Sequence, residues 1–169
     1  MTNDQLLILK ADLATRFPTA PQTADYALDV IVPAYNAAHS PDFWVWRTSV
    51  TESEIVSKAG PEGTVWSWTA YIARTEAERD GWKRMFNGIY TINPSLPNVR
   101  QGIADIFSGN TNNAPAQRTH LLAVARRKAT VMERLLATGT GTTAAPGTLT
   151  FEGAISYNDI LQAWNLQPA

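Results

Sequence analysis

The sequence predicts an all-α fold, a small helical bundle with one long helix in its C-terminal half and one or two short extended segments. Three observations lead to this prediction. Apolar residues recur at three- and four-residue intervals along most of the chain, which is the period of an amphipathic helix. Several of these runs follow a capping pair, in which Ser or Thr precedes Glu, Gln or Asp by three residues. Proline and glycine separate the runs, as they do between helices.

The N-terminal part of the chain is predicted to form two helices. Residues 2–17 begin with the capping pair Thr2 and Gln5, and leucine repeats along one face of the helix. Residues 23–38 form the second helix. Pro33 lies inside its apolar pattern, and a proline there should kink or divide the helix because it has no N–H to donate.

The middle of the chain is predicted to contain short elements separated by turns. Residues 40–50 form an extended segment, and a capping pair at Thr51 and Glu54 begins a short helix. Apolar residues between 65 and 73 fit both the helical and the strand period, so this segment is left undecided. The remaining features are a turn at Gly60–Gly63, a helix over 75–87 closed by Gly88, and a helix from Pro97 that ends before Gly109.

The longest helix is predicted over residues 114–137. The Thr, Gly, Ala and Pro residues that follow bury little apolar surface, so residues 138–150 should be a flexible loop or arm. Residues 148–151 could add a short strand, and residues 156–164 a last helix. The length of 169 residues suits one domain spanning the whole chain.

Composition narrows the functional classes. The absence of cysteine excludes disulfides and thiolate metal sites. Charged residues make up 17 % of the chain, against about 25 % in ordinary domains. With six Trp and five Tyr, this indicates either surface meant for partners or a core rich in aromatic residues. The net charge of −1 argues against a dedicated nucleic-acid binder. No apolar run approaches the roughly 20 residues that span a bilayer, and the charged N-terminal helix is unlike a signal peptide, so a cytoplasmic protein is expected.

No motif in the sequence predicts an enzyme, and no catalytic, cofactor-binding or metal-binding residue is assigned. Gly139-Thr140-Gly141 follows a helix and lacks the strand and third glycine of a dinucleotide-binding loop, so it is interpreted as a helix stop. The two histidines, His39 and His120, have no clustered ligands nearby, and His120 is expected to be a packing or surface residue. A hydrolase would need a convergent triad, which sequence alone does not exclude.

One basic cluster stands out. Arg126, Arg127 and Lys128 follow one another inside the predicted long helix. They are candidate contacts to DNA phosphate or to an acidic partner. The alternative is an ordinary solvated helix face, because successive helical residues point in directions about 100° apart.

Residues 43–46 alternate two apolar faces. Phe43 and Val45 lie on one side of an extended segment, and Trp44 and Trp46 lie on the other. If one side packs on the core, the other needs a cover, which is supplied either by this chain or by a neighbouring subunit.

Three blocks of the sequence resemble proteins encoded among the virion-assembly genes of tailed bacteriophages, and are similar to head–tail connector adaptors. The blocks are Phe43-Trp44-Val45-Trp46-Arg47-Thr48, then Asn93-Pro94-Ser95-Leu96-Pro97-Asn98-Val99-Arg100-Gln101-Gly102-Ile103, and the run from Ala137 to Gly153. Together they extend over residues 43–155. None of them is a catalytic motif.

The resemblance implies a subunit of a ring, usually of twelve copies, that lies under the portal and around the DNA channel of the virion. Expected partners are further copies of the chain, the portal protein, a tail-side connector or tail protein, and genomic DNA bound without sequence specificity. No cofactor and no membrane are expected. The candidate subunit-interface residues are Trp44, Trp46, Thr140, Thr142 and Phe151. The alternatives are a tail-completion, tail-terminator or head-decoration protein, and a small DNA-binding packaging regulator; a substantial sheet would favour a tail terminator.

Overall fold

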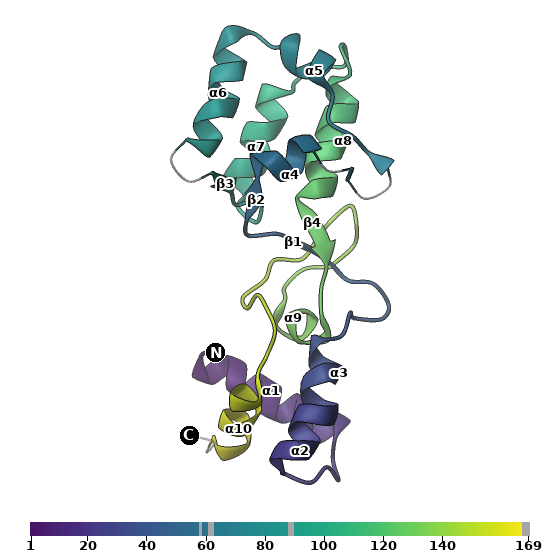
Figure 1. The fold of residues 1–169 in the computed structure, drawn as a ribbon, viewed down its shortest axis with the longest axis vertical. Coiled ribbons are helices and arrows are strands. Elements are labelled where there is room, and N and C mark those ends of the chain that lie inside the picture. The colour runs from purple at the N-terminus through teal and green to yellow at the C-terminus, as the bar shows by residue number, and fades with distance from the viewer. Residues whose placement is uncertain (58, 61–62, 88–89, 167–169) are drawn as a thin grey trace. The chain divides into compact units, whose positions relative to one another are not determined.

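The computed structural model describes residues 1–57, 59–60, 63–87 and 90–166 (Figure 1). Its contacts group into two compact units. Unit 1 comprises residues 1–45 and 128–169, and unit 2 comprises residues 46–127. Unit 2 is therefore one continuous stretch inserted into the sequence of unit 1, whereas the sequence predicted a single domain.

The prediction of an all-α fold is wrong, because the described residues also form two small two-stranded sheets. Strand β1 (Trp44–Trp46) is paired with β4 (Arg126–Lys128), and β2 (Val50–Thr51) runs antiparallel to β3 (Thr91–Ile92). Each strand has only two or three residues. Strand β1 lies in the extended segment predicted over residues 40–50. Strands β3 and β4 were not predicted, because two or three residues are too few to show the alternation by which a strand is recognised in sequence.

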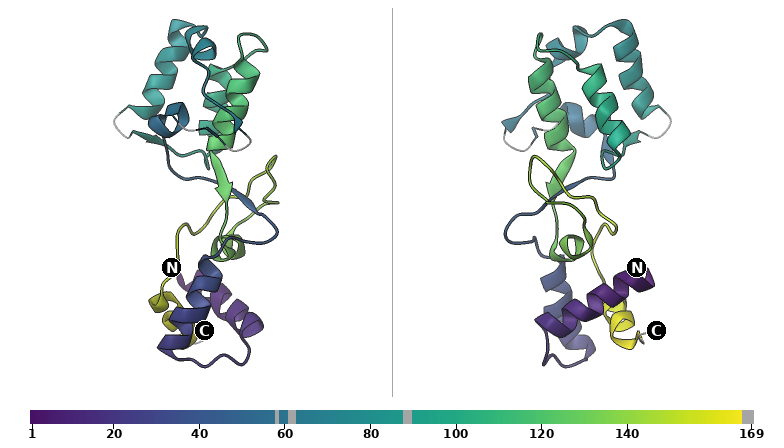
Figure 2. Two further views of the ribbon diagram at one scale, coloured as in Figure 1. Left: turned by 45° about the vertical axis from the view of Figure 1, so that its right-hand side comes forward. Right: turned by 180° about the vertical axis from the view of Figure 1, so that it is seen from behind.

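Unit 1 contains the first and last helices of the chain. Its helical elements are α1 (Asn3–Arg16), α2 (Ala24–Tyr26), the π-helix η1 (Ala27–Ile31), α3 (Val32–Asn36), α9 (Val131–Leu136) and α10 (Tyr157–Asn165). Helix α1 packs against α10, as all the views show (Figures 1 and 2). The core of this unit is lined by leucines of α1 and by side chains of η1, α3, α9 and α10.

The predicted helices at the N-terminus are confirmed. Thr2 and Gln5 form the expected capping box at the start of α1. Pro33 divides the second helix as expected, because the carbonyl of Asp29 cannot receive an i+4 hydrogen bond from a residue without an N–H. The backbone accommodates this with the wider π-turn of η1, in which the Val32 N–H donates to the Ala27 carbonyl.

Unit 2 contains five helices among its described residues, with a core of its own. They are α4 (Glu52–Ser57), α5 (Trp68–Ile72), α6 (Glu76–Phe86), α7 (Pro97–Ile106) and α8 (Ala114–Val124). The predicted starts at Thr75 and Pro97 are confirmed. Parts of the predicted Gly60–Gly63 turn, and the predicted cap Gly88, lie outside the described residues.

The predicted long helix over 114–137 is wrong. Helix α8 ends at Val124, β4 follows, and α9 begins at Val131. Backbone groups between the two helices bond sideways instead of along a helix: the N–H of Ala129 donates to the carbonyl of Phe43 at 2.8 Å, and the carbonyl of Ala129 accepts from His39 at 3.0 Å. A new capping box at Thr130 then starts α9.

Residues 138–150, predicted to be a flexible loop or arm, form a hydrogen-bonded loop of unit 1. Thr138 and Thr148 exchange two backbone hydrogen bonds of 3.0 and 2.9 Å. The carbonyl of Gly141 accepts from the N–H of Trp44 at 2.7 Å, and the N–H of Gly147 donates to the carbonyl of Trp44 at 2.8 Å. In place of the strand suggested for residues 148–151, the structure has only isolated bridges at Gly147 and Thr148.

Candidate functional site

The segment that the sequence left undecided forms an exposed apolar surface of unit 2. Helix α5 begins at Ser67, whose Oγ accepts from the N–H of Ala70 at 3.1 Å. Trp68 and Ile72 are four residues apart, so they lie on the same side of this helix. Their exposed fractions are 57 % and 68 %, and that of Val65 just before the helix is 65 %. We call Val65, Trp68 and Ile72 the α5 face.

The α5 face lies over a packed cluster of aromatic rings. Trp66 has its ring centroid 5.3 Å from that of Trp82 and 6.0 Å from that of Phe107, and both of those rings are buried. The exposed ring of Trp68 meets Trp66 edge-on at 5.7 Å and Tyr71 edge-on at 6.0 Å. Trp68 is therefore fixed by its neighbours although it is half open to solvent, which is typical of a preformed interface anchor.

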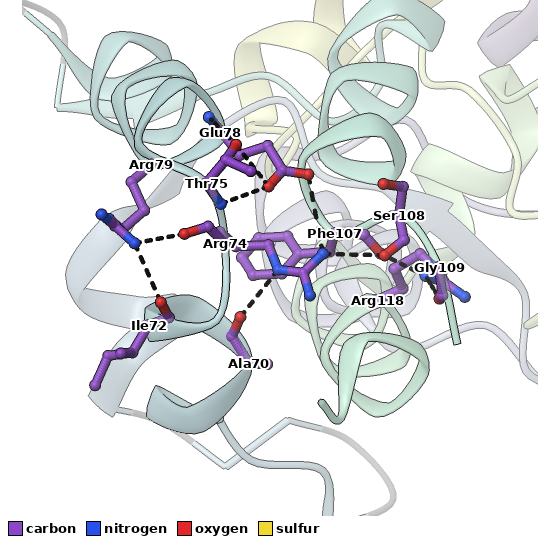
Figure 3. A network of polar contacts seen from close by, with 10 residues as sticks. All are labelled: Ala70, Ile72, Arg74, Thr75, Glu78, Arg79, Phe107, Ser108, Gly109 and Arg118. Carbon is purple, nitrogen blue, oxygen red and sulfur yellow. Dashed lines mark hydrogen bonds and ion pairs between the residues drawn. The ribbon is translucent and has the colours of Figure 1, made fainter. Parts of the chain in front are cut away.

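Arginines fasten the backbone around α5. The buried guanidinium of Arg74 donates through Nε to the carbonyl of Ala70 at 3.1 Å and through Nη1 to the carbonyl of Ser108 at 3.0 Å (Figure 3). Arg118 of α8 donates to the carbonyls of Phe107 and Gly109. These bonds satisfy the carbonyl of Ala70 in the last turn of α5 and the carbonyls of residues 107–109 just after α7.

Arg79 closes the same network at its outer edge. Its Nη1 donates to the carbonyl of Ile72 at 3.1 Å and to the carbonyl of Arg74 (Figure 3). The side chain of Ile72 points away from this network in the same view. Both of these acceptors are neutral carbonyl oxygens, so neither offsets the positive charge of Arg79 beside the α5 face.

Glu78 supplies the carboxylate of the network. Its Oε2 accepts from the backbone N–H of Thr75 at 2.7 Å and from the Thr75 hydroxyl at 2.9 Å, and its Oε1 lies 3.9 Å from Nη1 of Arg74. The hydrogen bond from the Thr75 backbone is the main reason that the pKa of Glu78 is lowered. The carboxylate thus stays ionised as the N3 partner of Thr75 in the capping box of α6.

The predicted basic cluster does not lie on a helix. Arg126, Arg127 and Lys128 form strand β4, in which the two arginines are half-buried and the lysine is exposed. Nζ of Lys128 is 2.7 Å from the Asp42 carboxylate and 5.9 Å from the ring centroid of Trp44. The side chain of Lys128 is thus engaged within unit 1. A role of the triplet toward DNA or a partner stays a prediction.

The predicted alternation of residues 43–46 is confirmed, since Phe43 and Val45 are buried while Trp44 and Trp46 are half-buried. The chain itself covers part of the tryptophan side. The guanidinium of Arg100 lies 4.5 Å from the ring centroid of Trp46. Burial there lowers the pKa of Arg100. The amount of tryptophan surface left for a neighbouring subunit is smaller than the sequence suggested.

The other predicted interface residues lie in unit 1. Thr140 and Thr142 are exposed and bond across their own loop, the first through Oγ1 to the carbonyl of Ala145 at 3.1 Å and the second by accepting the Ala145 N–H at 3.0 Å. Phe151 is half-buried and packs on the core of unit 1. Their assignment to a subunit interface stays a prediction.

His120 is a packing residue, in line with the sequence. It is fully buried, with Nε2 2.7 Å from the carbonyl of Ile55 and Nδ1 3.2 Å from Oγ1 of Thr64. In the other unit, Nδ1 of His39 lies 2.6 Å from the carbonyl of Pro41. In the part of the chain that the structure describes, no group of three or more His, Asp or Glu side chains is arranged to hold a metal ion.

The α5 face was not predicted from the sequence, because Trp66, Trp68 and Ile72 fit both the helical and the strand period. Ser67 as an N-cap directly before Trp68 was the available signal for a helix. Every helix within the described ranges is too short or too polar to cross a bilayer. No protein-family model, curated protein or solved structure matches this chain.

Proposed function

We propose that this chain is a structural subunit of a tailed-bacteriophage virion, a head–tail connector adaptor that assembles as a ring under the portal around the DNA channel. The observation that carries the proposal is the α5 face, in which two aliphatic side chains are exposed close in sequence to an exposed tryptophan that contacts a packed aromatic cluster. Rigid, exposed aromatic anchors of this kind are enriched at the centres of protein interfaces. The resemblance of residues 43–155 to virion-assembly proteins supports a virion as this assembly.

The short strands bear on the choice among virion roles. A tail terminator is expected to contain a substantial sheet, whereas the two sheets described here have strands of two or three residues. This favours the adaptor over the terminator. Although the fold is mixed and not all-α, the adaptor therefore remains the leading role.

Two measurements test the proposal. Light scattering on the purified protein, alone and with the portal of the same phage, should give a ring mass or a ring formed on the portal. Immunogold labelling of purified virions should place the chain at the junction of head and tail. A persistent monomer that ignores the portal, with no label on virions, would refute the proposal. Label on the capsid surface or at the tail tip would reassign the chain to decoration or tail completion.

The basic triplet can be tested in the same particles. If Arg126, Arg127 and Lys128 contact DNA or a partner in the virion, reversing the three charges to glutamate should lower particle yield or DNA content. The matched control reverses two exposed cations of α6, Lys83 and Arg84. Particles with unchanged yield and unchanged DNA content would rule out this role for the triplet.

A further inference from the structure

The two units of the chain carry opposite net charge. Unit 1 contains eight Asp and Glu residues against four Lys and Arg residues, a net charge of −4. Unit 2 contains seven against ten, a net charge of +3. The two values together give the −1 of the whole chain. Such a division of charge lets one unit attract the opposite unit of another copy.

In the basic unit, the α5 face combines apolar side chains with a positive charge. Trp68 and Ile72 supply the apolar surface, and Arg79 lies beside it, bound to the carbonyl of Ile72 at 3.1 Å. The backbone under this face is fastened by Arg74 and Arg118, so the face exists before any partner binds. A preformed face loses little conformational entropy on binding.

In the acidic unit, the π-helix presents an apolar side chain between two carboxylates. Ala27, Ile31 and Tyr35 are fully buried on the inner side of this helical segment. Leu28 faces outward with an exposed fraction of 51 %. Asp25, three residues before Leu28, and Asp29, the residue after it, are also exposed. We call Asp25, Leu28 and Asp29 the η1 face. Single π-turns of this kind are rare in proteins overall, and a large share of those that occur lie at functional sites.

We propose that the η1 face of one copy of this chain docks on the α5 face of another copy, head to tail. This inference rests on the proposed function and deepens it, because it names the two surfaces through which adaptor subunits join. Leu28 would pack against Trp68 and Ile72, and the carboxylates of Asp25 and Asp29 would approach Arg79. Repeating this contact uses one face of each kind per copy, which is the condition for a closed ring or an open filament.

Charge also argues against the symmetric arrangements. Pairing two α5 faces would bring the two Arg79 side chains and two basic units together. Pairing two η1 faces would bring four carboxylates together. Juxtaposed like charges are unfavourable, so the heterologous pairing is the one that both charge patterns permit.

The test uses one disrupting variant on each face of the full chain. Ile72→Glu puts a carboxylate opposite Asp25 and Asp29, and Leu28→Lys puts a cation opposite Arg79. Both positions are exposed, so both variants should fold, which circular dichroism checks. In sedimentation velocity, each variant should associate at least about tenfold more weakly than the wild type. The matched controls, Ile8→Lys in unit 1 and Leu96→Glu in unit 2, alter exposed apolar residues outside the two faces and should associate normally.

Mixing the two disrupting variants gives the decisive readout. The Leu28→Lys chain keeps an intact α5 face and the Ile72→Glu chain keeps an intact η1 face, so one good interface remains. An equimolar mixture should regain association and form a complex of at least twice the 18.5 kDa chain mass. Raising the salt concentration should weaken this complex, because Asp25 and Asp29 are exposed and Arg79 is only half-buried.

Three outcomes would overturn the inference. The first is a wild-type chain that stays monomeric up to about 1 mM, where even a 4 kcal/mol interaction is half populated. The second is association that survives either disrupting variant, and the third is a mixture of folded variants that forms no complex. The second and third leave the proposed function standing if virions still carry the chain at the head–tail junction. Absence from virions would refute the proposed function even if the purified chain associates as described.

Discussion

Phe43 fits its site because two glycines leave room for its ring. A β-carbon at Gly141 would overlap the ring, and one at Gly147 would lie 2.8 Å from Cε1 of Phe43. The guanidinium of Arg134 lies 4.4 Å from the ring centroid on another side. Gly141 and Gly147, in the segment predicted to be a flexible loop or arm, are thus packing positions. Their role depends on a contact with a residue about a hundred positions earlier in the chain, which no local pattern can show.

Replacing Gly141 by alanine should destabilise unit 1. The added methyl group must displace the Phe43 ring, and the residue has a left-handed φ of +68°, so we expect a loss of about 3 kcal/mol in the free energy of unfolding. The matched control is Gly109→Ala, where φ is +82° and the space is open. That control should lose only about 1 kcal/mol. Urea denaturation measures both, and equal losses would contradict the packing role of Gly141.

Tyr35 makes the stability of unit 1 sensitive to alkaline pH. The ring is fully buried and its hydroxyl donates to Asp12 at 2.6 Å. Burial first, and then this hydrogen bond, raise the pKa of Tyr35 well above its ordinary value of 10.0. The folded state therefore keeps the phenol proton at a pH where the unfolded chain releases it. The contribution is fully present below pH 10 and is lost as the pH rises toward the folded-state value.

We expect the free energy of unfolding to fall above about pH 10 by about 1.4 kcal/mol per pH unit from this one group. Tyr35→Phe should remove that part of the pH dependence, although it also removes the hydrogen bond to Asp12 at every pH. Tyr90→Phe, at an exposed tyrosine, serves as the control. Denaturation series between pH 8 and 11 give the comparison, and parallel curves for the wild type and Tyr35→Phe would disprove the assignment.

At the scale of elements, capping pairs predicted helix starts well. The pairs at Thr2, Thr75 and Ser156 all begin helices with both reciprocal bonds present. The same spacing occurs at Thr130 and Glu133, inside the predicted long helix, where it marks the start of α9. Arg, Lys and Ala are good helix formers, so the residues of β4 and those next to them do not indicate that the predicted long helix is interrupted there. Their lateral hydrogen bonds come from tertiary structure, which local propensity does not contain.

Glu133 should be worth more than an ordinary capping residue. Its buried carboxylate accepts from the N–H of Thr130 at 3.0 Å through Oε2 and from the N–H of Gly153 at 3.0 Å through Oε1. Replacement by alanine leaves both N–H donors without this acceptor, so we expect Glu133→Ala to lower the free energy of unfolding by about 2–4 kcal/mol. The corresponding change at α1, Gln5→Ala in a more exposed box, should cost about 1 kcal/mol. Similar costs for the two variants would show that Glu133 only caps its helix.

At the scale of the whole molecule, the division into two units was beyond the reach of sequence pattern. The boundaries fall inside β1 and β4, where composition does not change and no linker of Pro, Gly or Ser is present. A length of 169 residues fits one domain as well as two. The α5 face could not be predicted from sequence pattern either, because its exposure depends on which side of a short helix the aromatic cluster occupies.

The insertion of unit 2 into unit 1 makes a prediction about folding. Residues 46–127 contain a complete hydrophobic core, with Trp82 and Phe107 buried at its centre. We expect this fragment of about 80 residues to unfold cooperatively and to keep the near-ultraviolet circular dichroism of its tryptophan cluster, since domains of this size can fold alone. A fragment ending at Gly109 lacks α8 and should show neither property.

The complementary deletion follows from the ends of unit 1. The N–H of Ala129 donates to the carbonyl of Phe43 at 2.8 Å, so the two segments of unit 1 lie side by side where unit 2 leaves and returns. A short Gly-Ser linker in place of residues 46–127 spans such a gap at little entropic cost. We therefore expect this chain to keep the core of α1, α3, α9 and α10, and to retain the alkaline pH dependence due to Tyr35. If the deletion chain is unfolded while residues 46–127 fold alone, unit 1 depends on unit 2 and only unit 2 is a domain.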